Sequence, residues 1–349
     1  MSDPTPVAVV GASGYSGAEL LRFLLMHPEA DLVCLTSRQL AGTRLDGAFP
    51  RFGNSRAAGL AFSDANVDVI AASGARCAFL ALPHGVAAEF AVPLLEKGLR
   101  VIDLSADFRL RSPSVYKEYY QHEHPAPALL EEAVYGLPER RAAQIRDARL
   151  VASPGCYPTS ILLPLLPLLD RRMIALDGIV DSSMSGTSGA GKSASVPLLF
   201  AECNESLRAY GAPKHRHLSE IEQELALAAG QSVTITFIPH LVPVTAGICT
   251  TISAALADPA PSLEDISKAY KEAYSNAPFV RLLGPGAFAD TKNVTKTNFI
   301  DIGWHLDPRT RRVILSSAED NLAKGAASQA IQSFNLMFGY PETTGLMIF

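Results

Sequence analysis

The chain has 349 residues, 48% of them hydrophobic and 19% charged, with a formal net charge of −5. This length is sufficient for two domains, and an acidic balance without a long basic run argues against nucleic acid as a partner. The most apolar run, residues 161–170, is too short to span a bilayer, and residues 1–14 lack the features of a signal peptide. We therefore expect a globular protein with no membrane partner.

The five cysteines are scattered, odd in number and without a Cys-x-x-Cys pair. This pattern favours a reducing, cytoplasmic location, and it argues against a disulfide framework or a structural zinc site. We expect no metal.

The first predicted elements form a strand–helix–strand unit. Residues 6–10 predict a short strand, the run from residue 15 has helical periodicity, and residues 31–37 predict a second strand. Between the first strand and the helix, GASGYSG forms a glycine turn. Glycines here let the backbone approach a pyrophosphate at the helix N-terminus, whereas a turn needed only for packing is the alternative. The candidate cofactor-binding residues are Gly11, Ser13, Gly14, Tyr15, Ser16 and Gly17.

The end of the second strand indicates which dinucleotide binds. An NAD site usually has an acidic residue about 20 positions after the glycines, against the ribose 2′-hydroxyl. Asp31 lies near that distance but begins the strand, which ends in Thr36, Ser37 and Arg38. A hydroxyl and a guanidinium suit a 2′-phosphate, so Ser37 and Arg38 favour NADP(H). The alternative for Arg38 is a solvated side chain at a loop start.

Two more buried strands are predicted at residues 77–85 and 100–110, with a helix at 86–98 between them. In open parallel sheets, ligands bind beyond the carboxyl ends of the strands. His84 and the segment 105–109 therefore lie where a cofactor or a substrate binds.

Cys156 stands between a predicted strand and an apolar helix. Gly155 permits a tight turn, and Pro158 fits a first helical turn. A thiol at a helix N-terminus has a lowered pKa, and its thiolate is a nucleophile. Backbone N–H groups at the same place can stabilise an oxyanion. The alternative is a buried, inert cysteine.

The stretch SGTSGAGKSASV, residues 185–196, matches the spacing of a phosphate loop, with Gly186, Gly191, Lys192 and Ser193 in the required places. A phosphate loop needs a later strand that ends in an aspartate for Mg²⁺, and none follows. A nucleotide site is already predicted at Gly11. We therefore reject an NTPase, and expect the backbone N–H groups of this loop to face an anion or a ring.

His215 and His217 flank Arg216 in a basic cluster. Ser219 and Glu222 have capping-box spacing, which predicts that the helix starts after both histidines. In extended backbone the two histidines share one face. A metal site would need a third ligand, and none is suggested.

The chain resembles the N-acetyl-γ-glutamyl-phosphate reductase family, which is related to the aspartate-semialdehyde dehydrogenases and, more distantly, to glyceraldehyde-phosphate dehydrogenase. The resemblance runs nearly end to end. It is carried by the motifs GASGYSGAELLR, LALPHG, DLSADFRL, YGLPE, PGCYPT, SGTSGAGK, HRH…EI and DNLAKGAA, of which PGCYPT is the most specific. Two departures are Ser219, where the family usually has proline, and Ser328, where it often has glycine.

The resemblance implies an arginine-biosynthetic enzyme that reduces an acyl phosphate with NADPH through a cysteine thioester, and a homo-oligomer, either dimer or tetramer. It implies Cys156 as nucleophile and one of His217 and His215 as acid/base, with His217 slightly favoured. It implies further cofactor contacts from Pro83, His84, Ser185, Gly186, Gly189 and Asn321. The candidates for holding the anionic substrate are Arg109, Arg111, Ser188 and Lys192.

The expected fold is α/β, a Rossmann domain followed by an α+β catalytic domain of the semialdehyde-dehydrogenase type. The expected division is an NADP-binding domain at 1–155, completed by a C-terminal helix at 321–349, and a catalytic and dimerisation domain at 156–320. Alternatives are the same chemistry on N-acetyl-aminoadipyl phosphate or a carrier-linked acyl phosphate, a non-covalent NADP dehydrogenase in which Cys156 is a bystander, and a nucleotide sensor without catalysis.

Overall fold

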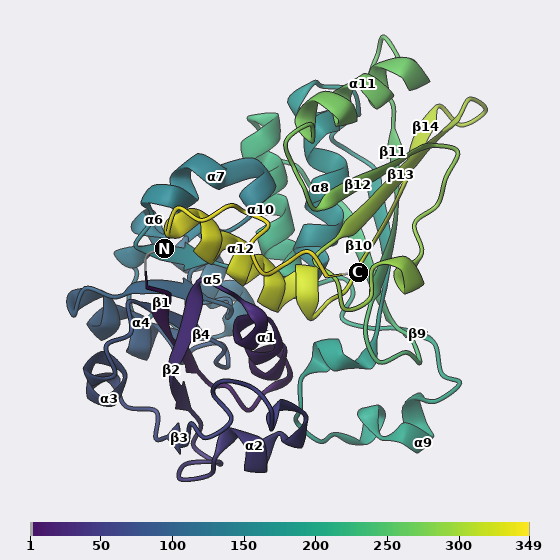
Figure 1. The fold of residues 1–349 in the computed structure, drawn as a ribbon. Helices are drawn as coiled ribbons and strands as arrows, with labels where there is room; N and C mark the ends of the chain where they lie inside the picture. The colour runs from purple at the N-terminus through teal and green to yellow at the C-terminus, as the bar shows by residue number, and fades with distance from the viewer. Residues whose placement is uncertain (1–2, 349) are drawn as a thin grey trace. The chain divides into compact units, whose positions relative to one another are not determined.

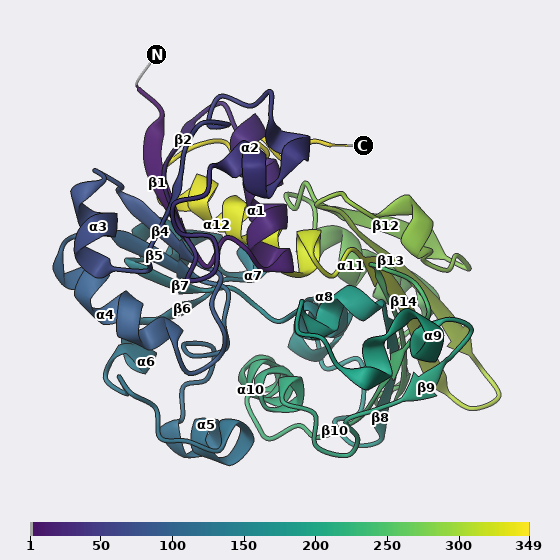
Figure 2. The same cartoon turned by 90° about the horizontal axis from the view of Figure 1, so that it is seen from below.

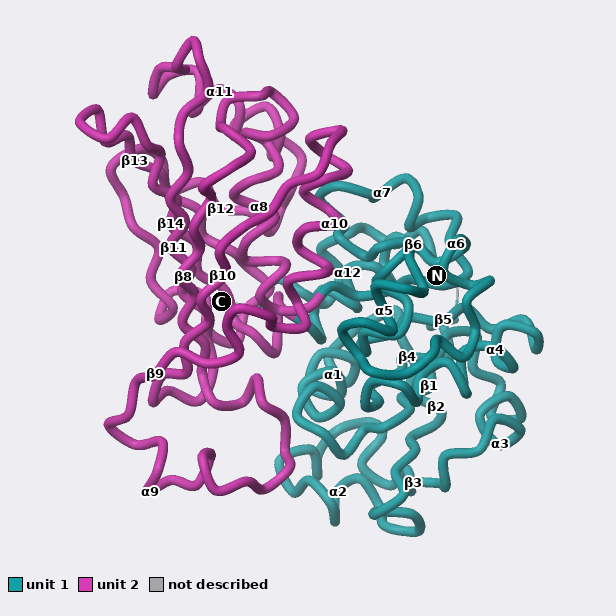
Figure 3. Tube along the Cα trace, turned by 180° about the vertical axis from the view of Figure 1, so that it is seen from behind, with its two compact units in different colours: residues 1–154, 326–349 teal, residues 155–325 magenta. Residues whose placement is uncertain are grey.

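A fully parallel sheet organises the first part of the chain. The computed structural model describes residues 3–348 and divides the chain into unit 1, residues 1–154 with 326–349, and unit 2, residues 155–325 (Figure 3). The first boundary falls one residue earlier than the sequence predicts. Residues 321–325, expected with the C-terminal helix, lie in unit 2.

The sheet of unit 1 has the strand order of a Rossmann fold, with a reversal between β1 and β4. All of its strand pairs are parallel. In sheet order its strands are β3 (Phe62–Ser63), β2 (Ala30–Thr36), β1 (Thr5–Val10), β4 (Cys77–Leu80), β5 (Arg100–Asp103), β7 (Leu150–Ala152) and β6 (Val134–Tyr135). Its helices are α1 (Tyr15–Met26), α2 (Leu45–Ala48), η1 (Pro50–Phe52), α3 (Val67–Ala72), α4 (Ala87–Glu96), α5 (Pro113–Tyr120), α6 (Leu129–Glu132), α7 (Pro138–Asp147) and α12 (Ser328–Met337) (Figure 1).

The helix α12 belongs to unit 1 although it follows unit 2 in the chain. All ten of its residues are buried. It packs against α7, α1 and β5, and the Phe334 ring contacts Phe79 of β4 with centroids 5.8 Å apart. The Rossmann sheet therefore has its core completed by the end of the chain.

Unit 2 is built on a mixed sheet that carries α8 on one side (Figure 2). In sheet order its strands are β12 (Val280–Pro285), β13 (Ile300–Asp307), β14 (Arg312–Glu319), β11 (Ile248–Ala255), β8 (Ile179–Ser185), β10 (Ile235–Leu241) and β9 (Arg208–Ala209). Its helices are α8 (Cys156–Asp170), η2 (Thr187–Ala190), η3 (Val196–Leu198), α9 (Phe200–Cys203), α10 (His217–Ala229), α11 (Leu263–Ala273) and η4 (Thr291–Asn293). A π-helical turn, η5 (Ala323–Ala327), leads out of the unit.

The helix α8 contains two internal prolines and still remains a helix. A proline has no N–H, so Pro164 and Pro167 cannot donate to the carbonyls four residues earlier, those of Ser160 and Leu163. Ser317 of β14 donates its hydroxyl to the Ser160 carbonyl at 2.6 Å, and Tyr274 donates to the Leu163 carbonyl. These side chains satisfy buried carbonyls that would otherwise cost free energy.

No helix within the described residues 3–348 is long and apolar enough to cross a membrane. The predicted α/β class, with a Rossmann unit and a second α+β unit, is confirmed.

Candidate active site

The turn after β1 packs tightly against the protein's own backbone, and it leads into the open N-terminus of α1. Gly11 has φ +86°, and a Cβ there would lie 2.4 Å from the Ala81 carbonyl oxygen. A Cβ at Gly17 would lie 2.7 Å from Ala12. Gly14 is the N-cap of α1, whose start has no side-chain cap and no acidic residue in its first turn. The helix N-terminus therefore presents its N–H dipoles with no side chain in competition, which suits a pyrophosphate.

The residues at the end of β2 differ in how they are engaged. Ser37 is buried, donates its hydroxyl to Ser13 at 3.0 Å, and accepts from the N–H groups of Gln39 and Leu40. Its single proton is thereby used within the protein. Arg38 is exposed, so its guanidinium is accessible to a phosphate group of a ligand.

The loops after β4 and β5 are tied together by a buried carboxylate in the segment 105–109, which the sequence placed beside a ligand. Asp107 accepts from the Gly85 N–H at 2.7 Å and from the Tyr116 hydroxyl at 2.9 Å. His84, a predicted cofactor contact, accepts through Nδ1 from the Ala106 N–H at 3.0 Å. The signal for Asp107 was its place in the DLSADFRL motif.

Arg109, a predicted substrate ligand, is buried within unit 1. Its Nε donates to the Ser153 carbonyl at 2.7 Å and its Nη2 to the Leu104 carbonyl at 2.9 Å. These two bonds fix the loop that follows β5 to the end of β7. Arg111, the other predicted arginine, is exposed.

In unit 2, Cys156 is the first residue of α8, and Gly155 is its N-cap in extended backbone. The thiol is half-buried. Its position at a helix N-terminus favours the thiolate through the helix dipole. A Cβ at Gly325 would lie 2.8 Å from Cys156 Cβ and 2.9 Å from the Glu319 carboxylate, so a glycine at this point leaves room for the thiol.

A second buried carboxylate, which sequence reasoning missed, supports this turn. Glu220 is fully buried in the first turn of α10, and its Oε1 accepts from the Gly155 N–H at 2.8 Å. It belongs to the HRH…EI motif, which is the only signal the sequence offered for it.

Both histidines lie beside the residue that follows the cysteine. The Tyr157 ring is 5.7 Å from the His215 ring and 5.9 Å from the His217 ring, and the two imidazoles are 5.0 Å apart. His215 also packs edge-on against Tyr210 and Phe237. The structure therefore brings the two candidate acid/base residues together at the start of α8.

The prediction that the helix begins after both histidines is wrong. The helix α10 starts at His217, and Ser219 donates its hydroxyl back to the Arg216 carbonyl at 2.9 Å instead of capping. The His217 N–H donates to His215 Nδ1 at 3.1 Å. Burial, and secondly the Arg216 charge, lower the pKa of His215 to about 4.

The glycine-rich loop after β8 does not cradle a phosphate. The N–H groups of Gly186, Thr187 and Ser188 donate to carbonyls of the turn 244–247 at 2.9–3.0 Å. No helix begins at Lys192, which is exposed. The expectation that these N–H groups face an anion or a ring is therefore wrong, because the strand-to-strand turn uses them.

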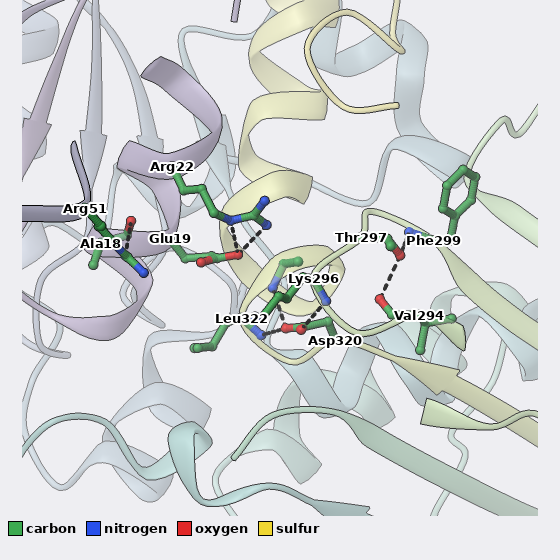
Figure 4. A network of polar contacts seen from close by, with 11 residues as sticks. Ala18, Glu19, Arg22, Arg51, Val294, Lys296, Thr297, Phe299, Asp320 and Leu322 are labelled. Carbon is green, nitrogen blue, oxygen red and sulfur yellow. Dashed lines mark hydrogen bonds and ion pairs between the residues drawn. The ribbon is translucent and has the colours of Figure 1, made fainter. Parts of the chain in front are cut away.

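The loop is held instead by Asn321. Its Oδ1 accepts from the Gly247 N–H at 2.7 Å and its Nδ2 donates to the Ser188 hydroxyl at 3.0 Å. Ser185 is buried and Gly189 is exposed. The preceding Asp320 accepts from the N–H groups of Lys296, Leu322 and Ala323, which fixes the turn that carries Asn321 (Figure 4).

Two family models match the two parts of the chain. One described as "Semialdehyde dehydrogenase, NAD binding domain" covers residues 6–148, and one described as "Semialdehyde dehydrogenase, dimerisation domain" covers residues 156–321. Aspartate semialdehyde dehydrogenase II from Vibrio cholerae has a similar fold, with a TM-score of 0.72 and 19% identity over 97% of this chain and 99% of that chain. The NADP complex of the Candida albicans enzyme gives a TM-score of 0.69 and 16% identity over 96% and 99%. The fold is that of the semialdehyde dehydrogenases.

The more similar relatives narrow this class. The chain is 62% identical to an N-acetyl-gamma-glutamyl-phosphate reductase from Akkermansia muciniphila, with 98% of each chain covered. It is 50% identical to one from Geobacter metallireducens, with 97% of each covered. The chain belongs to the N-acetyl-gamma-glutamyl-phosphate reductase family, which confirms the resemblance seen in the motifs.

Proposed function

We propose that this protein reduces N-acetyl-L-glutamyl 5-phosphate to N-acetyl-L-glutamate 5-semialdehyde with NADPH, a step of arginine biosynthesis. The observation that carries the proposal is Cys156 at the N-terminus of α8, with His215 and His217 around the neighbouring Tyr157. The relatives named for this reaction are similar along nearly their whole length.

The chemistry follows from a thiol in this position. The Cys156 thiolate attacks the acyl carbonyl and forms a carbon–sulfur bond. The bond between that carbon and the phosphate oxygen breaks, so inorganic phosphate departs and a thioester on Cys156 remains. NADPH, when bound, supplies the hydride that reduces this thioester. The resulting hemithioacetal collapses, the carbon–sulfur bond breaks, and the aldehyde leaves as the thiolate is restored.

His217 is the proposed acid/base. An efficient general base has a pKa near the working pH, whereas the pKa of His215 is lowered to about 4 and its Nδ1 already accepts from the His217 N–H. His217 takes the thiol proton and returns a proton to the oxyanion. His215 keeps that imidazole in place. Loss of activity in His215→Asn with normal activity in His217→Asn would reverse this assignment.

We propose that the cofactor site takes NADP(H). The start of α1 has no side-chain cap and offers N–H donors to a pyrophosphate. Arg38 is the proposed ligand of the 2′-phosphate, since Ser37 has committed its hydroxyl proton to Ser13. Pro83 and His84 remain proposed cofactor contacts, as does Asn321.

We infer a homo-oligomer formed through unit 2. Val180 and Met184 alternate with buried residues along β8 and are 37% and 39% exposed, so this face of the central strand presents two uncovered apolar side chains, one on each side of Ser182. The matching family model is described as a dimerisation domain. The free cysteines agree with a reducing compartment such as the cytoplasm.

A coupled assay tests the function and the substrate together. Run in reverse, aldehyde, phosphate and NADP⁺ should give NADPH absorbance with the five-carbon acetylated semialdehyde. No signal is expected with its six-carbon homologue. Equal rates with both compounds, or a signal with the longer one alone, would move the proposal to the aminoadipyl substrate.

A further inference from the structure

A line of buried hydroxyl groups joins the sheet of unit 2 to the helix that carries Cys156. Ser183 Oγ on β8 lies 2.8 Å from Asp181 Oδ1 and 2.7 Å from Thr250 Oγ1 on β11. Thr250 Oγ1 lies 2.9 Å from Ser160 Oγ on α8, and Ser160 Oγ donates to the Tyr157 carbonyl at 2.9 Å. All four side chains are fully buried. The line therefore starts at a carboxyl group and ends one residue after Cys156.

The direction of this line follows from counting protons, because each hydroxyl has only one to donate. A carbonyl can only accept, so the proton of Ser160 goes to Tyr157. The Thr250 proton must then go to Ser160. The Ser183 proton must in turn go to Thr250, which leaves the contact between Ser183 and Asp181 without a hydroxyl proton. If Ser183 donates to Asp181 instead, one of the other three contacts is left without a proton; all four are hydrogen bonds only when Asp181 supplies the fourth proton.

We propose that Asp181 is a neutral carboxylic acid in the folded protein and that it positions the Cys156 turn through Ser183, Thr250 and Ser160. The positioning role rests on the function proposed above, whereas the protonation does not. Ionisation of Asp181 would reverse the line, since a carboxylate can only accept. Ser160 would then donate to Thr250, and the Tyr157 carbonyl would lose its bond to the Ser160 hydroxyl.

The surroundings of Asp181 support the neutral form. Its register neighbours are Phe237 on β10 and Ile252 on β11, both buried and apolar. Its Oδ2 is buried with no hydrogen-bond partner among the described residues, which a carboxylate oxygen tolerates poorly. Burial raises its pKa to about 8. The titratable and charged side chains on the packed elements are Cys156, Tyr157, Asp170, His217, Glu220, Glu222, Glu224, His240, Cys249, Arg312 and Glu319. None of them contributes to that shift.

Infrared difference spectroscopy of the unliganded protein tests the protonation directly. The carbonyl stretch of a protonated carboxylic acid should be present at pH 7, lost in Asp181→Asn, and retained in the control Ser182→Ala, which alters the neighbouring residue on the opposite face of β8. In the parent the band should titrate away near pH 8. If Asp181→Asn removes no such band at pH 7, the neutral acid is ruled out, whatever the protein catalyses.

Enzyme kinetics test the positioning. The proposal predicts that the activity of the parent falls above about pH 8. Asp181→Asn still donates to Ser183, so it should keep most of kcat at pH 7 and lose that fall. Thr250→Val keeps the shape but removes the hydroxyl, and should lower kcat roughly threefold to tenfold, while Thr250→Ser restores it. The alkylation rate of Cys156 should follow the same order. Equal rates in Thr250→Val and Thr250→Ser, or an unchanged alkaline limb in Asp181→Asn, would overturn the positioning role.

Discussion

The Glu220 carboxylate accepts a hydrogen bond from the Gly155 N–H at 2.8 Å, which ties the first turn of α10 to the N-cap of α8. These residues are 65 positions apart in the chain. Cys156 is the first residue of α8 and His217 is the first residue of α10. The hydrogen bond between the two helix starts therefore limits the movement of both residues.

Glu220→Ala should lower kcat more than Glu220→Gln does. Alanine leaves the Gly155 N–H without its acceptor, a loss of about 1–3 kcal/mol for a buried donor, whereas the glutamine oxygen can still accept. Removal of the negative charge near the thiol should also lower the pH at which iodoacetamide alkylates Cys156 in Glu220→Gln. Identical kcat values in both variants, with an unmoved alkylation profile, would mean that this bond does not serve the site.

Cys156→Ser should lose several orders of magnitude in turnover while it still binds NADPH. A serine hydroxyl hardly ionises at neutral pH, whereas the thiol has an ordinary pKa of about 8.5. In the parent without NADPH, acyl phosphate should release one equivalent of phosphate and leave a thioester mass on the Cys156 peptide. Phosphate release without an adduct there would instead support a non-covalent dehydrogenase.

His217→Asn should reduce kcat by roughly 10²–10⁴-fold, the usual value of general acid–base catalysis, and His215→Asn by much less. The histidines also predict a pH dependence of stability. Because the folded pKa of His215 is lowered to about 4, its contribution is present above its unfolded pKa of about 6.5 and is lost as pH falls toward 4.

In urea unfolding of the parent, the free energy of unfolding should therefore decline between about pH 6.5 and 4. In His215→Asn this decline should be smaller, by on the order of 2 kcal/mol. If the two proteins lose stability in parallel over this range, His215 is not held neutral by the fold.

Gly325→Ala should damage catalysis with little loss of NADPH affinity. The new Cβ would lie 2.8 Å from Cys156 Cβ and 2.9 Å from the Glu319 carboxylate, so the Cys156 side chain and the carboxylate both have to move. Small displacements at a reacting atom cost about 10²-fold. Gly47→Ala is the matched control, because its nearest neighbour would lie at 3.7 Å. Full activity in Gly325→Ala would show that the Cys156 side chain can shift at this contact without loss of catalysis.

Arg38→Ala should raise the KM for NADPH far more than the KM for NADH. Arg38 is exposed, and we propose that its guanidinium pairs with the 2′-phosphate, which NADH lacks. Steady-state kinetics with both cofactors measure the ratio. A parallel rise for both cofactors, or a parent that prefers NADH, contradicts the assignment.

Local patterns predicted the Rossmann strands and the cysteine at a helix start, because glycine turns, apolar runs and Pro158 act over a few residues. Ser219 misled, since its hydroxyl bonds backward to Arg216 and only tertiary packing decides between that bond and a cap. The bond from Gly155 to Glu220 and the use of the Gly186 loop by residues 244–247 depend on partners distant in the sequence. Neither contact produces a periodic pattern in the sequence from which it could be predicted.

The split of unit 1 across the chain has a consequence for biosynthesis on the ribosome. The buried helix α12 is translated after the whole of unit 2, yet it packs against α1, β5 and α7, which are all translated before unit 2. During synthesis, the Rossmann sheet therefore keeps an apolar surface exposed until residues 328–337 leave the ribosome. A pause in translation, or a frameshift in the last codons, would therefore impair the folding of unit 1, which is synthesised first, and not that of unit 2.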